Sequence, residues 1–460
     1  MNNYTEINSI NQTIFNESGT LFLPTSLNGF INTETKQIHT SNDNDYYFFL
    51  GSVELQEEDT LCPKCGCKMY KHDSHEIVLR HLPIGSIYTY IKPTIYQFQC
   101  DHCGYNQTQN ISFKADGYRI TKPLKNYVED LLSTNKFTLT DIANLTGLNR
   151  KMVKDIDKKR LLDKYTVTND DGTISLIQPE QQTKYLAIDE FKLHDGYKYA
   201  THIIDLETGH ILWIARGKKK QVVYDFINHV GLDWMSKVIA VGCDMNSDFE
   251  EAFKEKCPNI KIVYDRFHIT KHLNETIGDI RKDEQSRLKN EGDIEGYKSL
   301  KKSRYILTSS MKTLEKKDKE VEDNKVISKG NELFKKPDII RKGKYRERYE
   351  TIINNNEPLL VTELLKELLT QAYETNDIKE MEDTILDAMW LCEQNGNKHL
   401  IKFMNLLYNH LDGIVTHAEY HISSGKIEGI NNKIKTVRRQ AYGLPDDEYF
   451  FLKCMDLSRA

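Results

Sequence analysis

Two cysteine motifs of the same form constrain the fold of this chain more than any other feature. They read Cys62-Pro63-Lys64-Cys65-Gly66 and Cys100-Asp101-His102-Cys103-Gly104. Two residues between the cysteines let both sulfurs reach one tetrahedral zinc ion, and the glycine permits the tight turn that follows. The paired motifs predict a structural Zn²⁺ site with four thiolate ligands: Cys62, Cys65, Cys100 and Cys103. A redox pair or packed thiols are the alternatives, and Cys67 is expected to be a spare thiol.

Length and composition indicate a globular protein of several domains. At 460 residues the chain is too long for one ordinary domain and suggests about three. The net charge of −5 is weak evidence against nucleic acid binding, because affinity follows local basic patches. No apolar run is long enough to span a membrane, and no signal peptide is recognisable. We therefore expect a protein of the reducing cytoplasm, whose nine cysteines are metal ligands or buried thiols.

The N-terminal part of the chain divides into two segments. Residues 1–57 are rich in Asn, Thr and Ser and are expected to form a polar leader, with one strand at Tyr46–Val53. Residues 58–108 hold the cysteine motifs between short β-like runs and are predicted to form a zinc ribbon. Pro93 is expected to separate two of these runs.

Residues 120–165 have helical apolar spacing and are predicted to form a helix-turn-helix DNA-binding domain. Thr140 is expected to cap the first helix, Gly147 to turn the chain and Asn149 to cap the second helix. Three basic side chains of the second helix suit DNA phosphates and guanine edges: Arg150, Lys151 and Lys154. An ordinary helical hairpin with a solvated basic face is the alternative.

Three apolar strands in residues 183–270 are each followed by an acid. Strands and helices alternate here in an order that implies an α/β sheet with mixed pairing. The acids are Asp189, Asp244 and Asp265. Such strand ends are where α/β sheets build their sites, and converging carboxylates require a cation, so a pair of divalent ions is expected. For any one aspartate, a helix cap or turn is the alternative. Glu190 is expected on the opposite face of its strand from Asp189.

Residues 271–420 are predicted to be almost entirely helical. Residues 421–460 are predicted to begin with a loop and helix cap at Ser423-Ser424-Gly425, followed by a further helix. Its apolar face is Ile427, Ile430, Ile434 and Val437, and Glu428 lies in its first turns. Its polar side carries candidates for DNA contact: Asn432, Lys433, Lys435, Arg438 and Arg439. A basic surface helix is the alternative.

The chain resembles bacterial insertion-sequence transposases of the ISL family. The resemblance is carried by the two cysteine motifs and by four segments: IDE, VGCDMN, VYDRFHI and SSGKIEGINNKIKTVRRQAYG. The resemblance implies a multidomain α/β protein with a zinc ribbon and a helix-turn-helix before an RNase H-like catalytic domain. That domain would begin at 183–270, be interrupted by an all-helical insertion at 271–420, and end with the helix of 421–460. On the family pattern the catalytic acids are Asp189, Asp244 and Glu428, which would bind two Mg²⁺ or Mn²⁺ ions. Asp265 and His268 match the supporting D-x-x-H signature of related transposases.

The sequence therefore predicts a DDE transposase that binds the terminal inverted repeats of its element, cuts DNA, and joins the freed 3′-hydroxyls to target DNA. No P-loop motif is present, so no ATP is required. Two ends must be handled together, so we expect a dimer or larger assembly on DNA, associated with the nucleoid. A DNA-binding regulator on a catalytically silent scaffold and a plain metal-dependent nuclease are the alternatives. A silent regulator is expected to have lost one of the three catalytic acids, whereas Asp189, Asp244 and Glu428 are all present in this sequence.

Overall fold

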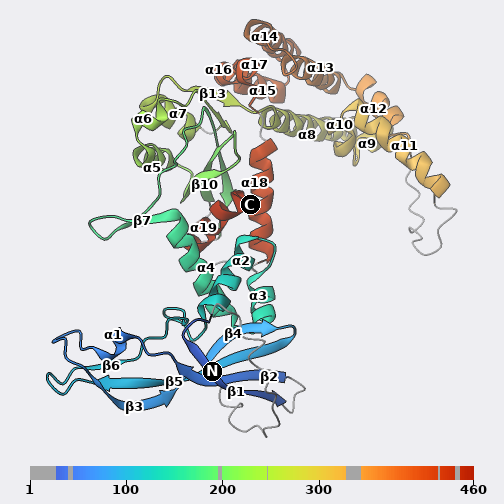
Figure 1. Ribbon diagram of the computed structural model, residues 1–460. Helices are drawn as coiled ribbons and strands as arrows, with labels where there is room; N and C mark the ends of the chain where they lie inside the picture. Colours follow the sequence, from blue (N-terminus) through green and yellow to red (C-terminus); the bar gives the residue numbers. More distant parts are fainter. Residues whose placement is uncertain are drawn as a thin grey trace. The chain divides into compact units, whose positions relative to one another are not determined.

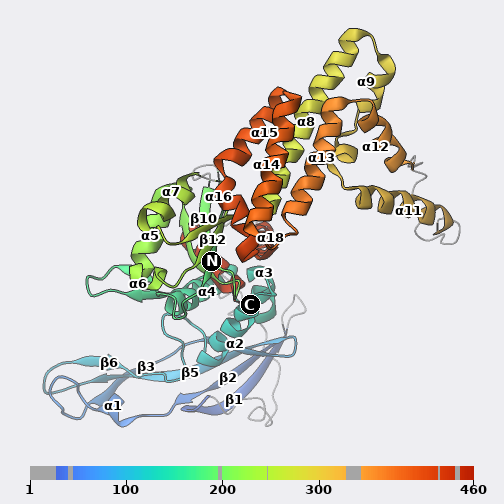
Figure 2. The ribbon, with the colours of Figure 1, turned by 90° about the horizontal axis from the view of Figure 1, so that it is seen from above.

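The computed structural model of the chain contains two compact units (Figures 1 and 2). The first comprises Met1–Ile177 and Lys435–Ala460, and the second Gln178–Ile434. The structure describes residues 27–39, 45–194, 199–245, 247–327, 343–422, 425–440 and 446–459. The first part of the expected polar leader and Ser423-Ser424 of the expected loop lie outside these residues, whereas Gly425 of that loop begins a helix.

A sheet of six strands forms the N-terminal part of the first unit. Its long strand β5 (Ile87–Gln99) pairs in parallel with β2 and antiparallel with β3, β4 and β6, while β2 pairs with β1. The other elements are β1 (Phe30–His39), β2 (Asp45–Val53), α1 (Glu57–Thr60), β3 (Tyr70–Glu76), β4 (Leu79–Ile84) and β6 (Asn106–Thr108). The strand predicted at Tyr46–Val53 is thus present as β2. The sequence does not predict β1, because most of its positions are only half-buried or exposed and lack an apolar alternation.

Pro93 does not interrupt β5, contrary to the expectation from sequence. It lies opposite Gly51 of β2, at the point where the neighbour on the other side changes from β4 to β3. There the Pro93 carbonyl accepts a hydrogen bond from the Ile77 amide. Because the neighbouring strand changes at this position, the ladder does not need the amide donor that proline lacks. The two predicted runs are therefore one strand of 13 residues.

Three helices follow in the first unit: α2 (Lys122–Ser133), α3 (Leu139–Thr146) and α4 (Arg150–Tyr165). Thr138, not Thr140, caps α3, because its hydroxyl accepts from the Asp141 amide while the Asp141 carboxylate accepts from the Thr138 amide. Gly147 turns the chain at φ +67°, and Asn149 caps α4 as predicted. A side chain at Gly147 would collide with the Arg80 guanidinium, 1.8 Å from the Cβ position. A short hairpin of β7 (Thr166–Thr168) and β8 (Ile174–Leu176) follows α4.

The last helix of the chain belongs to the first unit. α19 (Asp447–Ser458) packs on α4 (Figure 1). The preceding helix α18 (Gly425–Gln440) is divided between the units after Ile434. This differs from the expectation that all of residues 421–460 join the catalytic core. The difference arises from side-chain pairing between residues about 290 positions apart in sequence, which no local pattern encodes.

The second unit is built on a five-stranded sheet in the order β11-β10-β9-β12-β13. β9, β10 and β11 are antiparallel, whereas β12 runs parallel to both β9 and β13. The mixed pairing predicted from sequence is confirmed. The strands are β9 (Tyr185–Lys192), β10 (Tyr199–Asp205), β11 (Ile211–Arg216), β12 (Ala240–Cys243) and β13 (Lys261–Tyr264), joined by α5 (Lys220–Val230), α6 (Leu232–Met235) and α7 (Ser247–Lys256).

The two faces of this sheet are covered differently (Figure 1). Leu186, Ile188 and Val241 belong to one face and share a core with α5 and α7. On the other face, Ala240 and Val263 pack against Ile422, just before α18. Gly242 is required on that face, because a Cβ there would lie 2.6 Å from Ile422 Cγ2. The first part of α18 lies against this second face.

The rest of the second unit is helical, as predicted (Figure 2). α8 (Arg266–Glu291) starts at the sheet and extends about 39 Å from it at 1.5 Å per residue. The other helices are α9 (Ile294–Leu300), α10 (Arg304–Thr308), α11 (Met311–Ile327), α12 (Tyr345–Asn354), α13 (Glu357–Ala372), α14 (Ile378–Asn395), α15 (Lys398–Asn409), α16 (Leu411–Val415) and α17 (His417–Tyr420). One continuous apolar core joins them to the sheet. Within the described residues, no helix is long and apolar enough to cross a membrane.

Candidate active site

The four cysteines of the two motifs converge in the first unit. Their sulfur atoms all lie within 4.8 Å of one another, with Cys62 Sγ 3.4 Å from Cys103 Sγ and Cys65 Sγ 3.5 Å from Cys100 Sγ. The two turns have the same construction, because the amide of each following glycine donates to the carbonyl of the first cysteine at 2.8 Å. Both glycines have positive φ, +71° at Gly66 and +69° at Gly104. Four thiolates in this arrangement fit one tetrahedral zinc ion.

Cys67 lies outside this set of four. Its sulfur belongs to a second, more exposed group with Cys65 and His102, and it contacts the Cys65 carbonyl at 3.8 Å. Since Cys65 is shared by both groups, Cys67 and His102 do not make an independent metal site.

Asp189 lies on β9, the central strand of the second sheet. The sequence predicts Asp189 at the end of its strand. In the structure β9 continues three residues further, to Lys192. One carboxylate oxygen accepts from the Glu190 amide at 2.7 Å, and the other accepts from Asn431 Nδ2 of α18, also at 2.7 Å. Burial raises the pKa of Asp189, against the lowering effect of these two hydrogen bonds. A desolvated carboxylate of this kind is stabilised in its ionised form by a bound cation.

Asp244 follows directly after β12 and lies beside Asp189. Cys243 pairs with Ile188 in the parallel ladder, so one step further along both strands aligns Asp244 with Asp189 on the same face. The Asp244 carboxylate lies 3.0 Å from Nδ1 of His268 in the first turn of α8. The imidazole is mostly buried, so this contact fixes the orientation of the Asp244 side chain.

Asp265, the third acid at a strand end, caps α8. Its carboxylate accepts from the Phe267 amide at 3.0 Å. This is the structural alternative that the sequence leaves open for a single aspartate. The two members of the D-x-x-H signature therefore act differently: Asp265 begins the helix, and His268 reaches Asp244.

Glu428 is exposed in the first turns of α18. The predicted apolar face of this helix is confirmed, with Ile427, Ile430 and Ile434 all buried. Among the described residues, the groups of potential ligands within 4.8 Å of one another consist of the cysteine sets, so the three acids are not closely clustered here. Glu428 nevertheless lies one helical turn from Asn431, which contacts Asp189.

Two residues beside Asp189 are not predicted from sequence. Asn431, rather than its neighbour Asn432, makes the contact to the carboxylate. His202 of β10 pairs directly with Asp189 across the ladder and is fully buried, which lowers its pKa to about 4. Within the described part of the chain, neither ring nitrogen of His202 nor Oδ1 of Asn431 has a hydrogen-bond partner. The spacing of Asn431, three residues after Glu428, is a signal that could have identified it.

The predicted DNA-contacting residues lie on α4 and α18. Arg150 and Lys151 are exposed in the first turn of α4, whereas Lys154 is half-buried and lies 3.5 Å from Asp446. On α18, Arg438 is half-buried, and the remaining candidates are exposed: Asn432, Lys433, Lys435 and Arg439.

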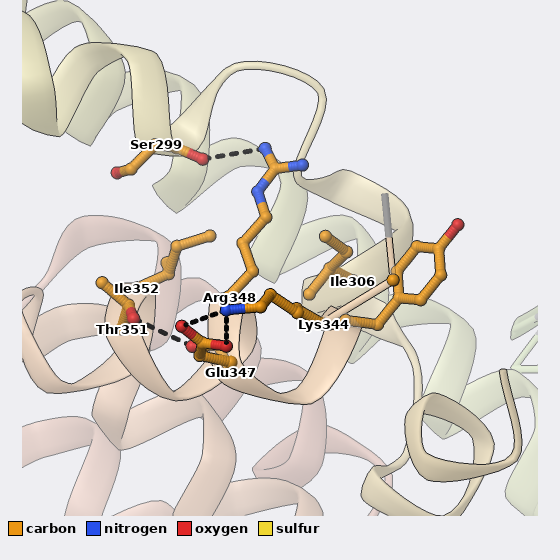
Figure 3. Close-up of a pocket in the computed structure, with 9 residues that line it drawn as sticks. Ser299, Ile306, Lys344, Glu347, Arg348, Thr351 and Ile352 are labelled. Atoms are coloured by element: carbon orange, nitrogen blue, oxygen red, sulfur yellow. Dashed lines mark hydrogen bonds and ion pairs between the residues drawn. The ribbon is translucent and has the colours of Figure 1, made fainter. Parts of the chain in front are cut away.

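A pocket of about 420 Å³ lies in the helical region and not at the carboxylates (Figure 3). It is lined by residues of α9, α10 and α12 and by the approach to α12. Arg348 in its wall donates to the carbonyls of Ser299 and Lys301 at 3.0 and 2.7 Å, and Lys344 pairs with Glu347 at 2.9 Å. Arg348 thus joins α12 to α9, and none of the acids of the candidate site lines the pocket.

Comparison with known proteins identifies related transposases. A family model described as "Transposase", of the ISL3 type, matches residues 186–454, and a second, "zinc-finger of transposase IS204/IS1001/IS1096/IS1165", matches residues 58–103. The chain is 26% identical over 396 residues to the transposase for insertion sequence element IS1001 of Bordetella parapertussis, covering 85% of this chain and 87% of that protein. It is 24% identical over 92 residues to the transposase for element IS1557 of Mycobacterium tuberculosis, covering 20% of this chain and 21% of that protein. The matched zinc-finger segment contains all four clustered cysteines, which supports a structural zinc. The chain belongs to the ISL3 family of insertion-sequence transposases.

Proposed function

We propose that this transposase binds the ends of its insertion sequence and cuts and joins DNA strands with Asp189, Asp244 and Glu428. The observation that carries the proposal is the alignment of Asp189 and Asp244 on neighbouring strands, with the helix of Glu428 joined to Asp189 through Asn431. Asp189 and Asp244 lie on one face of the sheet, and in this proposal α18 supplies Glu428 as the third carboxylate.

The strand order supports an RNase H-like catalytic domain. Three antiparallel strands followed by two parallel ones, in the order β11-β10-β9-β12-β13, put Asp189 on the central strand and Asp244 after its parallel neighbour. α5 and α7 cover one face, and α18 crosses the other. In this proposal the helices α8–α17 are an insertion between the last strand and the helix that carries the glutamate.

The carboxylates fit magnesium or manganese, which prefer oxygen ligands. Bound by Asp189, Asp244 and Glu428, such ions would supply charge neutralisation and an activated hydroxyl for phosphodiester cleavage. The chain's own residues prepare the ligands. His268 orients Asp244, and Asn431 holds Asp189 while joining α18 to β9. Burial under α18 desolvates Asp189 and strengthens its interaction with a cation.

The helices α3 and α4 are proposed to be a helix-turn-helix that reads the element ends. The turn at Gly147 and the cap at Asn149 expose Arg150 and Lys151 at the start of α4. The N-terminus of a helix also attracts phosphate through its free amides and dipole. The zinc-binding module is proposed to complete this DNA-binding part.

A direct test uses the purified chain and a plasmid that carries the two ends of its insertion sequence. In Mg²⁺ we expect nicks that leave 3′-hydroxyls at the element ends, followed by products joined to target DNA. Binding without any cleavage in Mg²⁺ or Mn²⁺ would favour the regulator on a silent scaffold. Cleavage without joining would favour a plain nuclease.

Glu428 provides the first mutational prediction. Glu428→Gln keeps the side-chain shape but removes the charge, so metal affinity and cleavage are both expected to fall. Glu428→Asp withdraws the carboxylate by about 1.5 Å, one carbon–carbon bond, and misplacement on this scale costs about a hundredfold in rate. Cleavage of a supercoiled donor in Mg²⁺ and Mn²⁺ measures both effects.

The matched control for Glu428 is Gly429→Ala, since a Cβ at Gly429 meets nothing within 4 Å. This variant should cleave like the parent and slightly stabilise α18. All three variants should bind terminal DNA normally. Near-parental cleavage by Glu428→Gln would exclude Glu428 and leave Glu190 or Asp265 as the candidate third ligand.

The second prediction concerns end recognition by α4. Arg150→Ala and Lys151→Ala should weaken binding to the element ends. A lost base contact should cost about 1–3 kcal/mol, and a lost phosphate contact should lower the salt dependence by about one unit of slope. Affinity measured at several salt concentrations, on terminal and on unrelated DNA, separates the two roles. Parental binding by both variants would place the recognition surface elsewhere.

A further inference from the structure

Three carboxylates connect the C-terminal helix α19 to α4. Two of them are buried and the third is partly exposed. Asp157 of α4 is the first, and it accepts from Tyr449 Oη at 2.7 Å and Lys453 Nζ at 3.0 Å, both on α19. Asp456 of α19 is the second, and it accepts from Arg160 at 2.9 Å, among other groups of α4. The exposed fractions of their side chains are 0% and 2%.

These two buried carboxylates join α19 to α4. Burial alone would raise the pKa of Asp456, but hydrogen bonds from Arg160 and Lys164 hold it well below its usual range. Asp157 and Asp456 would each be costly to bury without these partners, because an unpaired charge in the interior is strongly unfavourable. These contacts bury both carboxylates between α4 and α19 and are independent of Asp446.

The third carboxylate, Asp446, forms a different kind of contact. It precedes α19 and lies 2.8 Å from Lys158 Nζ and 3.5 Å from Lys154 Nζ of α4. Its side chain is 25% exposed, and those of the two lysines are each 32% exposed. Ion pairs with this much solvent access contribute little to stability and exchange partners readily.

The two lysines continue the basic stripe that starts α4. Arg150, Lys154 and Lys158 are spaced four residues apart and lie on one side of the helix, next to Lys151. The stripe rises about 12 Å along the helix at 1.5 Å per residue. Its first part is exposed, and its second part is occupied by Asp446.

We propose that Asp446 occupies, in the DNA-free protein, the position of a DNA phosphate on Lys154 and Lys158. The inference rests on the proposed binding of DNA by α4. A carboxylate and a phosphodiester each offer anionic oxygens to the same ammonium groups. DNA that extends along the stripe must therefore displace Asp446 from the lysines. The chain thus restrains its own affinity for DNA, and a backbone phosphate that reaches this part of α4 releases the restraint.

Asp446→Asn tests this directly, because it removes the negative charge from this position. Asp446 also caps α19 by accepting from the Tyr449 amide, and asparagine retains this cap. The variant should bind duplex DNA about fivefold more tightly than the parent, the size expected when two partly exposed ion pairs no longer compete. The gain should appear on terminal and unrelated DNA alike, since phosphates carry no sequence information. In the Asp446→Asn background, Lys154→Ala with Lys158→Ala should remove the gain.

Asp163→Asn is the matched control. It removes one negative charge from α4 itself, at an exposed side chain for which the described residues show no ion pair. It should change affinity much less than Asp446→Asn, and thermal unfolding should show that both variants remain folded. Equal or weaker DNA binding by folded Asp446→Asn would overturn the inference. If the parent protein binds element ends no more tightly than unrelated DNA, end recognition by α4 is contradicted. The affinities of the parent and of Asp446→Asn for unrelated DNA would still test the role of Asp446.

Discussion

Asp244→Asn and Asp189→Asn are each expected to abolish strand cleavage, with a loss of about a thousandfold or more. Both changes keep the size of the side chain but remove a charged metal ligand. The several kcal/mol that a metal ion contributes to such a reaction correspond to a rate factor of this order. Rates of 3′-hydroxyl formation on a supercoiled donor in Mg²⁺ would measure the loss, and Mn²⁺ affinity would report it independently of cleavage. Terminal DNA binding should be retained, since these acids lie in the second unit.

Asp265→Asn is the matched comparison for Asp244→Asn. Asparagine caps a helix as well as aspartate does, so α8 and the contact of His268 with Asp244 should persist. We expect this variant to retain measurable cleavage. If Asp265→Asn is inactive and Asp244→Asn is active, the second acid has been assigned to the wrong strand.

Loss of zinc is the second change with a large expected effect. Each chain should contain about one zinc ion, and Cys100→Ser should release it, because Cys100 is buried among the four sulfurs. A structural zinc contributes about 10–16 kcal/mol of apparent binding free energy in small domains, so its loss should unfold the local β structure. Metal analysis, together with hydrogen exchange of β3 and β6, would show this. The second unit should remain folded, since it has a core of its own.

Cys67→Ser is the matched control for zinc binding. Cys67 lies outside the set of four sulfurs, so this variant should retain both the zinc ion and the protection of the strands. Freshly purified parent protein without zinc would contradict the assignment outright. Loss of zinc in Cys67→Ser but not in Cys100→Ser would mean that Cys67, with His102, belongs to the true ligand set.

Local features of this chain follow from the sequence alone. The cysteine turns need only a spacing of two and a glycine with positive φ, and both are present in each motif. Ile427, Ile430 and Ile434 of the predicted apolar face of α18 are buried. The cap at Asn149 and the turn at Gly147 were predictable for the same reason. For the turns and the cap, the deciding interactions lie within a few residues of one another.

The arrangement of the candidate site depends on contacts between distant parts of the chain. Asn431 rather than Asn432 reaches Asp189, 242 positions earlier, because the packing of Ile427, Ile430 and Ile434 sets the rotation of α18. Pro93 remains inside β5 because its neighbouring strand changes there. The basic face of α4 is partly covered because Asp446, 288 positions after Lys158, returns to it. Sequence periodicity specifies which side of an element is apolar, but the partner of each polar group is decided only when the elements pack together.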